Sequence, residues 1–114
     1  MMLKRFAYIL SLSLIFVTSA CQLTLPVKGQ LTNGKEKFTG LATGQLDGSG
    51  TLEISSNKGT DCQGNFVYTS SRTGEGTFVC SDGRSGPFSF VSTGSKGTGT
   101  GSIGGDAFTF VFGE

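Results

Sequence analysis

The chain has no histidine and no tryptophan among its 114 residues, and only two prolines. Without histidine there is no Ser-His or Cys-His pair to activate a nucleophile and no imidazole to hold a metal ion. The acidic residues are spread along the chain, and most fall in predicted turns or on the polar face of predicted strands. We therefore expect a protein that is not an enzyme and that holds no metal or cofactor.

An excess of charge of one sign is also missing. Beyond residue 20 the chain has seven basic and eight acidic residues, with no run of like charge. A net charge near −1 offers no electrostatic attraction to the phosphates of nucleic acid. Nucleic acid is therefore not an expected partner.

A long apolar stretch occurs only at the N-terminus. Lys4 and Arg5 precede an apolar run over residues 6–17, and the small residues Thr18-Ser19-Ala20 follow it. This order of charged, apolar and small residues is typical of a secretory signal. The run is shorter than the roughly 20 residues that a membrane-spanning helix needs, so we predict export, with a signal-peptide helix before the mature domain.

The segment Val17-Thr18-Ser19-Ala20-Cys21 resembles the lipobox of bacterial lipoproteins. The resemblance implies that Cys21 becomes the new N-terminus and carries the lipid, and that Gln22 after it directs delivery to the outer membrane. Two or three acyl chains are enough for stable anchoring. We predict a signal peptide over residues 1–20, a lipidated N-terminus and short tether over 21–27, and a β-domain over 28–114. Simple secretion is the alternative.

Two cysteines remain once Cys21 is acylated. Cys62 and Cys80 form an even pair in an oxidising compartment, which predicts a disulfide between them. If Cys62 faces Cys80 in a hairpin, Phe66 falls opposite Gly76, and a ring laid over a facing glycine pins the register of two strands. Closing this loop is worth roughly 3 kcal/mol in the chain-entropy picture.

Turn signals recur along the chain after Cys21 at the spacing of an all-β domain, and no helical period of useful length is present. We predict eight strands in an antiparallel up-and-down meander, with one apolar and one polar face. Such a sheet buries its apolar face by closing into a small barrel or by folding into a flattened sandwich. The predicted strands lie near residues 23–32, 35–46, 50–56, 60–68, 74–80, 86–93, 96–103 and 106–113.

Each turn also predicts a register for the strands that it joins. Taken together, these registers make large and small residues largely alternate across the apolar face, which lets a curved sheet close without overpacking. The predicted pairs are Gly29 with Phe38 around Asn33-Gly34, Gly44 with Leu52 and Leu46 with Gly50 around residues 47–49, Ile54 with Cys62 around residues 57–59, Phe88 with Phe78 around residues 81–85, Phe90 with Gly99 around Gly94-Ser95, and Gly99 with Phe110 around Gly104-Gly105.

One loop, residues 81–87, concentrates functional groups and is the candidate contact loop. Asp82 can hold Arg84 so that its guanidinium is presented to an acidic partner. The alternative is an ordinary turn at Asp82-Gly83 with Arg84 in solvent, which is the commoner arrangement.

The phenylalanines can either fill the core or line a cavity, and the pairing of glycines with neighbouring rings favours a filled core. The sequence thus favours a non-catalytic, membrane-anchored lipoprotein of the cell envelope that acts by display or by contact with an envelope protein. The alternative is an inhibitor or small-ligand-binding module. It would be similar, in architecture and anchor only, to the small periplasmic lipoprotein inhibitors of lysozyme, which are eight-stranded barrels with a disulfide.

Overall fold

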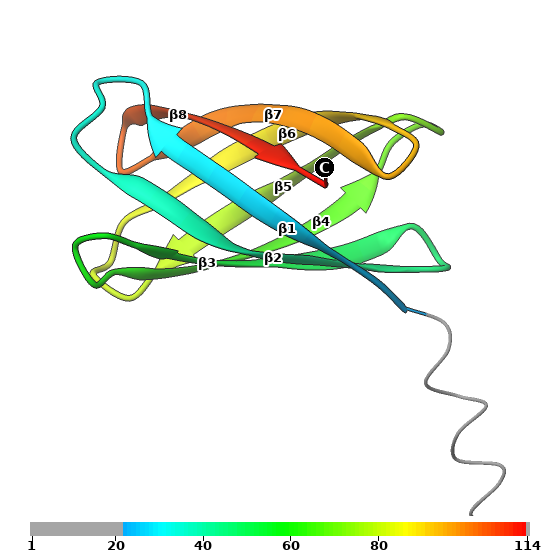
Figure 1. Ribbon diagram of the computed structural model, residues 1–114, viewed down its shortest axis with the longest axis horizontal. Coiled ribbons are helices and arrows are strands. Elements are labelled where there is room, and N and C mark those ends of the chain that lie inside the picture. Colours follow the sequence, from blue (N-terminus) through cyan, green and yellow to red (C-terminus); the bar gives the residue numbers. More distant parts are fainter. Residues whose placement is uncertain (1–21, 114) are drawn as a thin grey trace, which may run out of the picture.

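Eight antiparallel strands form one closed barrel in the computed structural model, which describes residues 22–113 (Figure 1). The predicted all-β meander is confirmed, and of the two predicted ways to bury its apolar face the chain adopts the barrel. The predicted signal-peptide helix and Cys21 lie outside the described residues. No helix within residues 22–113 is long and apolar enough to cross a bilayer. The strands are β1 (Gln22–Leu31), β2 (Lys37–Gln45), β3 (Ser49–Ser56), β4 (Asp61–Tyr68), β5 (Thr73–Cys80), β6 (Ser85–Thr93), β7 (Lys96–Ile103) and β8 (Asp106–Phe112).

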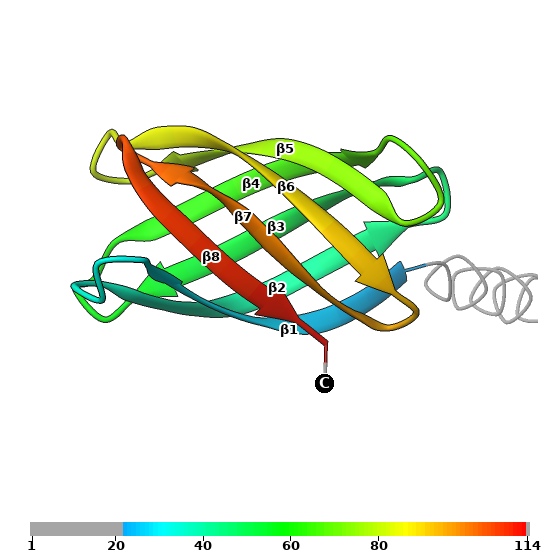
Figure 2. The same ribbon diagram turned by 90° about the horizontal axis from the view of Figure 1, so that it is seen from above.

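Pairing between β1 and β8 closes the barrel, with Val27 opposite Phe112 and Leu31 opposite Phe108. β8 stops at Phe112, so residues 22–25 at the start of β1 pair with β2 alone, while the Pro26 carbonyl oxygen accepts a hydrogen bond from the Gly113 N–H at 2.9 Å. Residues 22–27, the described part of the segment predicted to run as a tether into the first strand, belong to β1. It projects beyond the end of β8, and the strands tilt around the barrel axis (Figure 2).

The central hairpin has the predicted register. Cys62 pairs with Cys80 and Phe66 with Gly76 across β4 and β5, and a disulfide joins the two cysteines, whose Cα atoms are 3.9 Å apart. The registers predicted for the β1–β2, β3–β4, β6–β7 and β7–β8 hairpins are confirmed as well.

Two predicted registers are wrong, each by two residues. Gly44 pairs with Gly50 rather than with Leu52, and Phe88 pairs with Gly76 rather than with Phe78. The cause is the left-handed backbone of Gly48 (φ 86°) and Gly83 (φ 92°). In a three-residue hairpin loop the left-handed residue comes last, so the loops are residues 46–48 and 81–83.

The corrected registers place more phenylalanine rings directly opposite glycines. Phe90 now faces Gly74, and Phe88 faces Gly76. The ring of Phe110 lies so close over Gly99 that a Cβ added to Gly99 would collide with it. Glycine is required there because the facing ring already occupies the space of a side chain.

The two ends of the barrel differ. The N-terminal mouth carries the start of β1, the loops of residues 46–48 and 69–72, and the turn at 94–95; the distal end carries the loops of residues 32–36, 57–60 and 81–84 and the turn at 104–105. The largest side chains that are fully buried all lie in the distal half: Phe38, Phe78, Ile103 and Phe108. The core is therefore solid toward the distal end.

Candidate functional site

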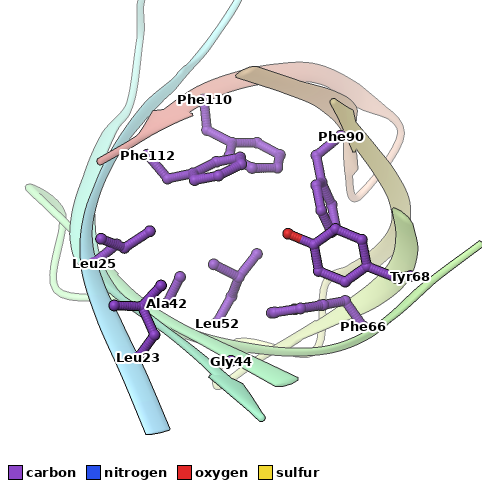
Figure 3. A pocket seen from close by; sticks show the side chains of 10 residues that line it. All are labelled: Leu23, Leu25, Ala42, Gly44, Leu52, Phe66, Tyr68, Phe90, Phe110 and Phe112. Atoms are coloured by element: carbon purple, nitrogen blue, oxygen red, sulfur yellow. The ribbon is translucent and has the colours of Figure 1, made fainter. Parts of the chain in front are cut away.

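The half of the barrel next to the N-terminal mouth contains an apolar cavity of about 70 Å³ (Figure 3). Nine of its ten lining residues have apolar side chains or none, and Tyr68 contributes the one side-chain polar atom. The lining residues are Leu23, Leu25, Ala42, Gly44, Leu52, Phe66, Tyr68, Phe90, Phe110 and Phe112. The expectation of a filled core is therefore correct for the distal half and wrong for the mouth.

Small residues on β2 leave this space open. The inward positions of β2 begin with the buried Phe38 at the distal end and finish with Ala42 and Gly44 at the mouth. A Cβ added to Gly44 would meet no atom nearer than the Leu23 carbonyl oxygen, at 4.0 Å. Gly44 thus differs from the other inward glycines, at each of which an added Cβ would lie within 3.0 Å of a ring or backbone atom.

The rings around the cavity are held against the wall. Phe66 lies over Gly50 and Phe90 lies over Gly74. The two rings also meet edge to face, with centroids 5.2 Å apart, and Phe112 packs in the same way on Phe90 at 5.7 Å. Edge-to-face pairs of this kind are favourable. Because each ring is fixed by a glycine behind it and a ring beside it, the centre of the mouth stays open.

A pair of hydroxyl groups marks the rim of the cavity. The Tyr68 hydroxyl points toward the interior in Figure 3 and donates to Ser92 Oγ over 3.4 Å. Ser92 Oγ in turn donates to the Arg72 carbonyl oxygen, also over 3.4 Å. Both bonds are longer than the usual 2.5–3.0 Å, roughly, of O–H···O bonds, so these hydroxyls retain capacity to bind a polar group at the rim.

Apolar side chains surround the opening. Leu23 on β1 is 57% exposed, and Leu46 in the loop of residues 46–48 is 85% exposed. The wrong β2–β3 register placed Leu46 in the apolar row opposite Gly50, whereas the corrected loop turns it out into solvent at the rim. The mouth therefore presents leucines as well as an open cavity.

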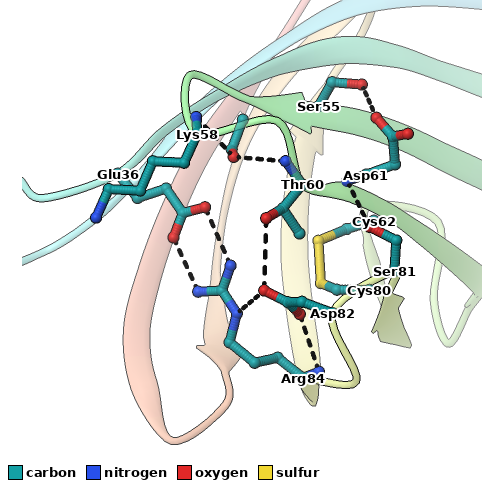
Figure 4. The surroundings of a disulfide bond; sticks show 11 residues. Glu36, Ser55, Lys58, Thr60, Asp61, Cys62, Cys80, Ser81, Asp82 and Arg84 are labelled. Atoms are coloured by element: carbon teal, nitrogen blue, oxygen red, sulfur yellow. Dashed lines mark hydrogen bonds and ion pairs between the residues drawn. A yellow bond between two sulfur atoms is a disulfide. The ribbon is translucent and has the colours of Figure 1, made fainter.

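The candidate contact loop lies at the distal end, where Asp82 holds Arg84 as predicted, with 2.7 Å between Arg84 Nε and Asp82 Oδ2 (Figure 4). The terminal nitrogens of Arg84 donate to both carboxylate oxygens of Glu36, at 2.8 and 3.0 Å. Three donors of the guanidinium are thus engaged within the chain. The bidentate contact also holds Glu36, which is only 3% exposed, against the end of the core.

Charge pairing shifts the protonation of this cluster. The hydrogen bond from Arg84 holds the pKa of Glu36 below its usual value, although burial alone would raise it. The backbone N–H of Arg84, followed by its side chain, lowers the pKa of Asp82. The three groups therefore stay charged near neutral pH and close the distal end above the Cys62–Cys80 disulfide.

Glu36 was missed by sequence reasoning because it is 48 residues from Arg84 along the chain. The sequence does contain a loop carboxylate and a loop arginine that a meander brings to the same end of the barrel. Their pairing can be predicted only once the strand order is known.

No protein-family model and no curated protein matches the chain. Among solved structures, a redesigned β-barrel, mFAP1, bound to DFHBI, is similar with a TM-score of 0.66 and 10% identity over 80% of this chain and 92% of that one. A de novo designed fluorescence-activating β-barrel is similar with a TM-score of 0.62 and 14% identity over 80% of this chain and 90% of that one. At these identities the likeness concerns the fold alone.

Proposed function

We propose that the protein is a non-catalytic lipoprotein of the bacterial envelope, held on the outer membrane by lipid on Cys21, whose barrel binds a slender apolar ligand through its N-terminal mouth. The observation that carries the proposal is the apolar cavity beside Gly44, which is open at the mouth and walled by phenylalanine rings that pack over glycines. The redesigned barrel mFAP1, of the same architecture, was solved bound to a small molecule, DFHBI.

The cavity limits the shape of the ligand. A volume of about 70 Å³ holds about five water-sized groups, at roughly 10–15 Å³ each. The two hydroxyls at the rim offer hydrogen bonds to one polar group. A short alkyl chain with a polar end, or the end of a longer chain, fits both features.

Thermal melting with short fatty acids tests this function. Residues 22–113 contain all eight strands and the disulfide, so the unlipidated chain from Gln22 carries the whole barrel. Hexanoate, octanoate and decanoate should raise its Tm in a saturable way, because a ligand that binds only the folded state stabilises it by about 2.7 kcal/mol at a hundred times its Kd.

The matched control is Gly44→Leu, which extends a side chain toward the cavity from a position where an added Cβ meets no atom nearer than 4.0 Å. The variant should fold and show no ligand-dependent rise in Tm. A flat response of the wild type to all three acids, or an equal response of the variant, would remove the proposed function.

Protein contact at the distal end is a second candidate, favoured by where the charges lie. Eight charged residues belong to the distal loops and adjoining strand ends: Lys35, Glu36, Lys37, Lys58, Asp61, Asp82, Arg84 and Asp106. Cross-linking from Lys58 in intact envelopes should capture a partner, and Lys58→Glu should abolish the capture. Murein hydrolases should lose activity at saturating protein if the partner is such an enzyme; undiminished hydrolysis would remove the inhibitor alternative.

A further inference from the structure

The mouth of the barrel lies next to the predicted lipid. β1 begins at Gln22, directly after Cys21, and Leu23 already lines the cavity. Each residue of an extended chain spans at most about 3.3–3.6 Å, so the backbone of Leu23 lies within about 7 Å of that of Cys21. With lipid on Cys21, no free linker would separate the barrel from the membrane, and the mouth would lie beside the bilayer.

The two rims of the barrel differ in the same direction. The most exposed apolar side chain of the described residues, Leu46, lies at the mouth, as do the exposed Leu23 and Tyr68. The paired charges of Glu36, Arg84 and Asp82 close the opposite end. Tyrosine is enriched where proteins meet the interface of a bilayer, and leucines at the rim gain from leaving water. The mouth is thus the end of the barrel suited to a lipid surface.

We propose that the barrel stands mouth-down on the outer membrane and that its cavity takes up the end of an acyl chain from a lipid of that membrane. This inference rests on the proposed function, from which it takes both the anchor and the ligand cavity. With the mouth on the bilayer, a chain passes from one apolar medium to another without crossing water. The narrow cavity and its solid floor of phenylalanine rings admit a single unbranched chain end.

Tyr68 provides the reporter for the test. The sequence has two tyrosines, Tyr8 in the predicted signal peptide and Tyr68 at the cavity rim, and no tryptophan. Emission from the processed lipoprotein therefore comes from the rim alone. The intact lipoprotein is reconstituted into phosphatidylcholine vesicles whose acyl chains carry bromine, a short-range quencher, either near the ester or near the chain end.

The two bromine positions distinguish contact of the mouth with the bilayer surface from entry of an acyl chain into the cavity. Bromine near the ester reaches Tyr68 if the mouth sits at the interface. Bromine at a chain end lies near the bilayer centre, roughly 15 Å below the edge of the hydrocarbon core, and reaches Tyr68 only when a chain end rises into the cavity. We expect both lipids to quench the wild type, and only the ester-brominated lipid to quench Gly44→Leu. The control Tyr68→Phe/Val79→Tyr, which moves the reporter to an exposed distal position, should escape both.

Quenching by ester bromine alone in the wild type would overturn chain uptake, as would chain-end quenching that Gly44→Leu leaves unchanged. Absence of all quenching would overturn the mouth-down seating. In either case a rise in the Tm of the unlipidated barrel with octanoate would leave the proposed function standing, so the two failures are distinguishable.

Discussion

Adding one methyl group at Gly99 or at Gly44 should change stability in opposite directions. At Gly99 the new Cβ would collide with the ring of Phe110, whereas at Gly44 it would meet nothing nearer than 4.0 Å. Phe88 and Phe108 restrain the Phe110 ring on the side away from the cavity, with ring centroids 5.9 and 5.7 Å from it. The pair of variants applies the same chemical change to a glycine that a ring covers and to a glycine that faces free space.

Two terms set the magnitude. Overpacking a filled core costs about 1–3 kcal/mol, and replacing glycine by alanine contributes about 0.4–1 kcal/mol of stability through the unfolded chain. Gly99→Ala should therefore destabilise the barrel by about 1–2 kcal/mol, and Gly44→Ala should stabilise it by up to about 1 kcal/mol. For a domain of this size each kcal/mol moves Tm by about 4–8 °C.

Calorimetry of the unlipidated chain measures both changes. In a Phe110→Leu background, Gly99→Ala should cost less stability than it does in the wild type, because the smaller side chain leaves room for the methyl group. Equal effects of the two alanine substitutions would refute the reasoning, since it would mean that Gly44 and Gly99 face equally crowded surroundings.

Three further predictions concern the distal end. Replacing both Cys62 and Cys80 by alanine should lower stability by about 3 kcal/mol. Urea melts should show a lower midpoint and a steeper slope, because the unfolded chain without the cross-link exposes more surface; an unaltered midpoint would exclude stabilisation by the disulfide. Glu36→Gln should cost about 2 kcal/mol at neutral pH, below the roughly 3–5 kcal/mol of a fully buried broken pair, because the Arg84 side chain is 26% exposed and keeps Asp82. Pairing with Arg84 lowers the folded-state pKa of Glu36, so the stability that the ionised carboxylate adds is complete above the usual value of 4.5 and is lost as pH falls through the lowered value. The free energy of unfolding of Glu36→Gln, measured by urea melts, should therefore change less with pH across that acid range than that of the wild type. Parallel pH profiles of the two proteins would contradict the pairing.

The sequence predicted the barrel well where local chemistry fixes the register. Asn33-Gly34 and the facing cysteines each admit one sensible pairing, and both pairings are observed. The two wrong registers come from the position of one glycine in each loop. Gly48 and Gly83 are the last residues of their loops, as their positive φ angles require, and applying that rule to the sequence would have moved both registers by two residues.

The cavity and the Glu36–Arg84 pair were not predictable from local patterns. Phenylalanines and glycines occur throughout the predicted strands. The closed barrel nevertheless brings Phe38, Phe78 and Phe108 together in the distal half, whereas Ala42 and Gly44 lie at the mouth. Likewise, Glu36 meets Arg84 only because β1–β2 and β5–β6 turn at the same end of the barrel. Both features depend on the closed three-dimensional arrangement rather than on any single segment.

The most direct test of the ligand cavity is an NMR measurement of magnetisation transfer between octanoate and the barrel. The methyl end of bound octanoate should give cross-peaks to Leu52 and Phe110, which line the cavity, and none to Phe38 or Ile103, which are buried in the solid half. Cross-peaks confined to exposed valines of the outer face, or none at saturating octanoate, would contradict a cavity that receives a chain.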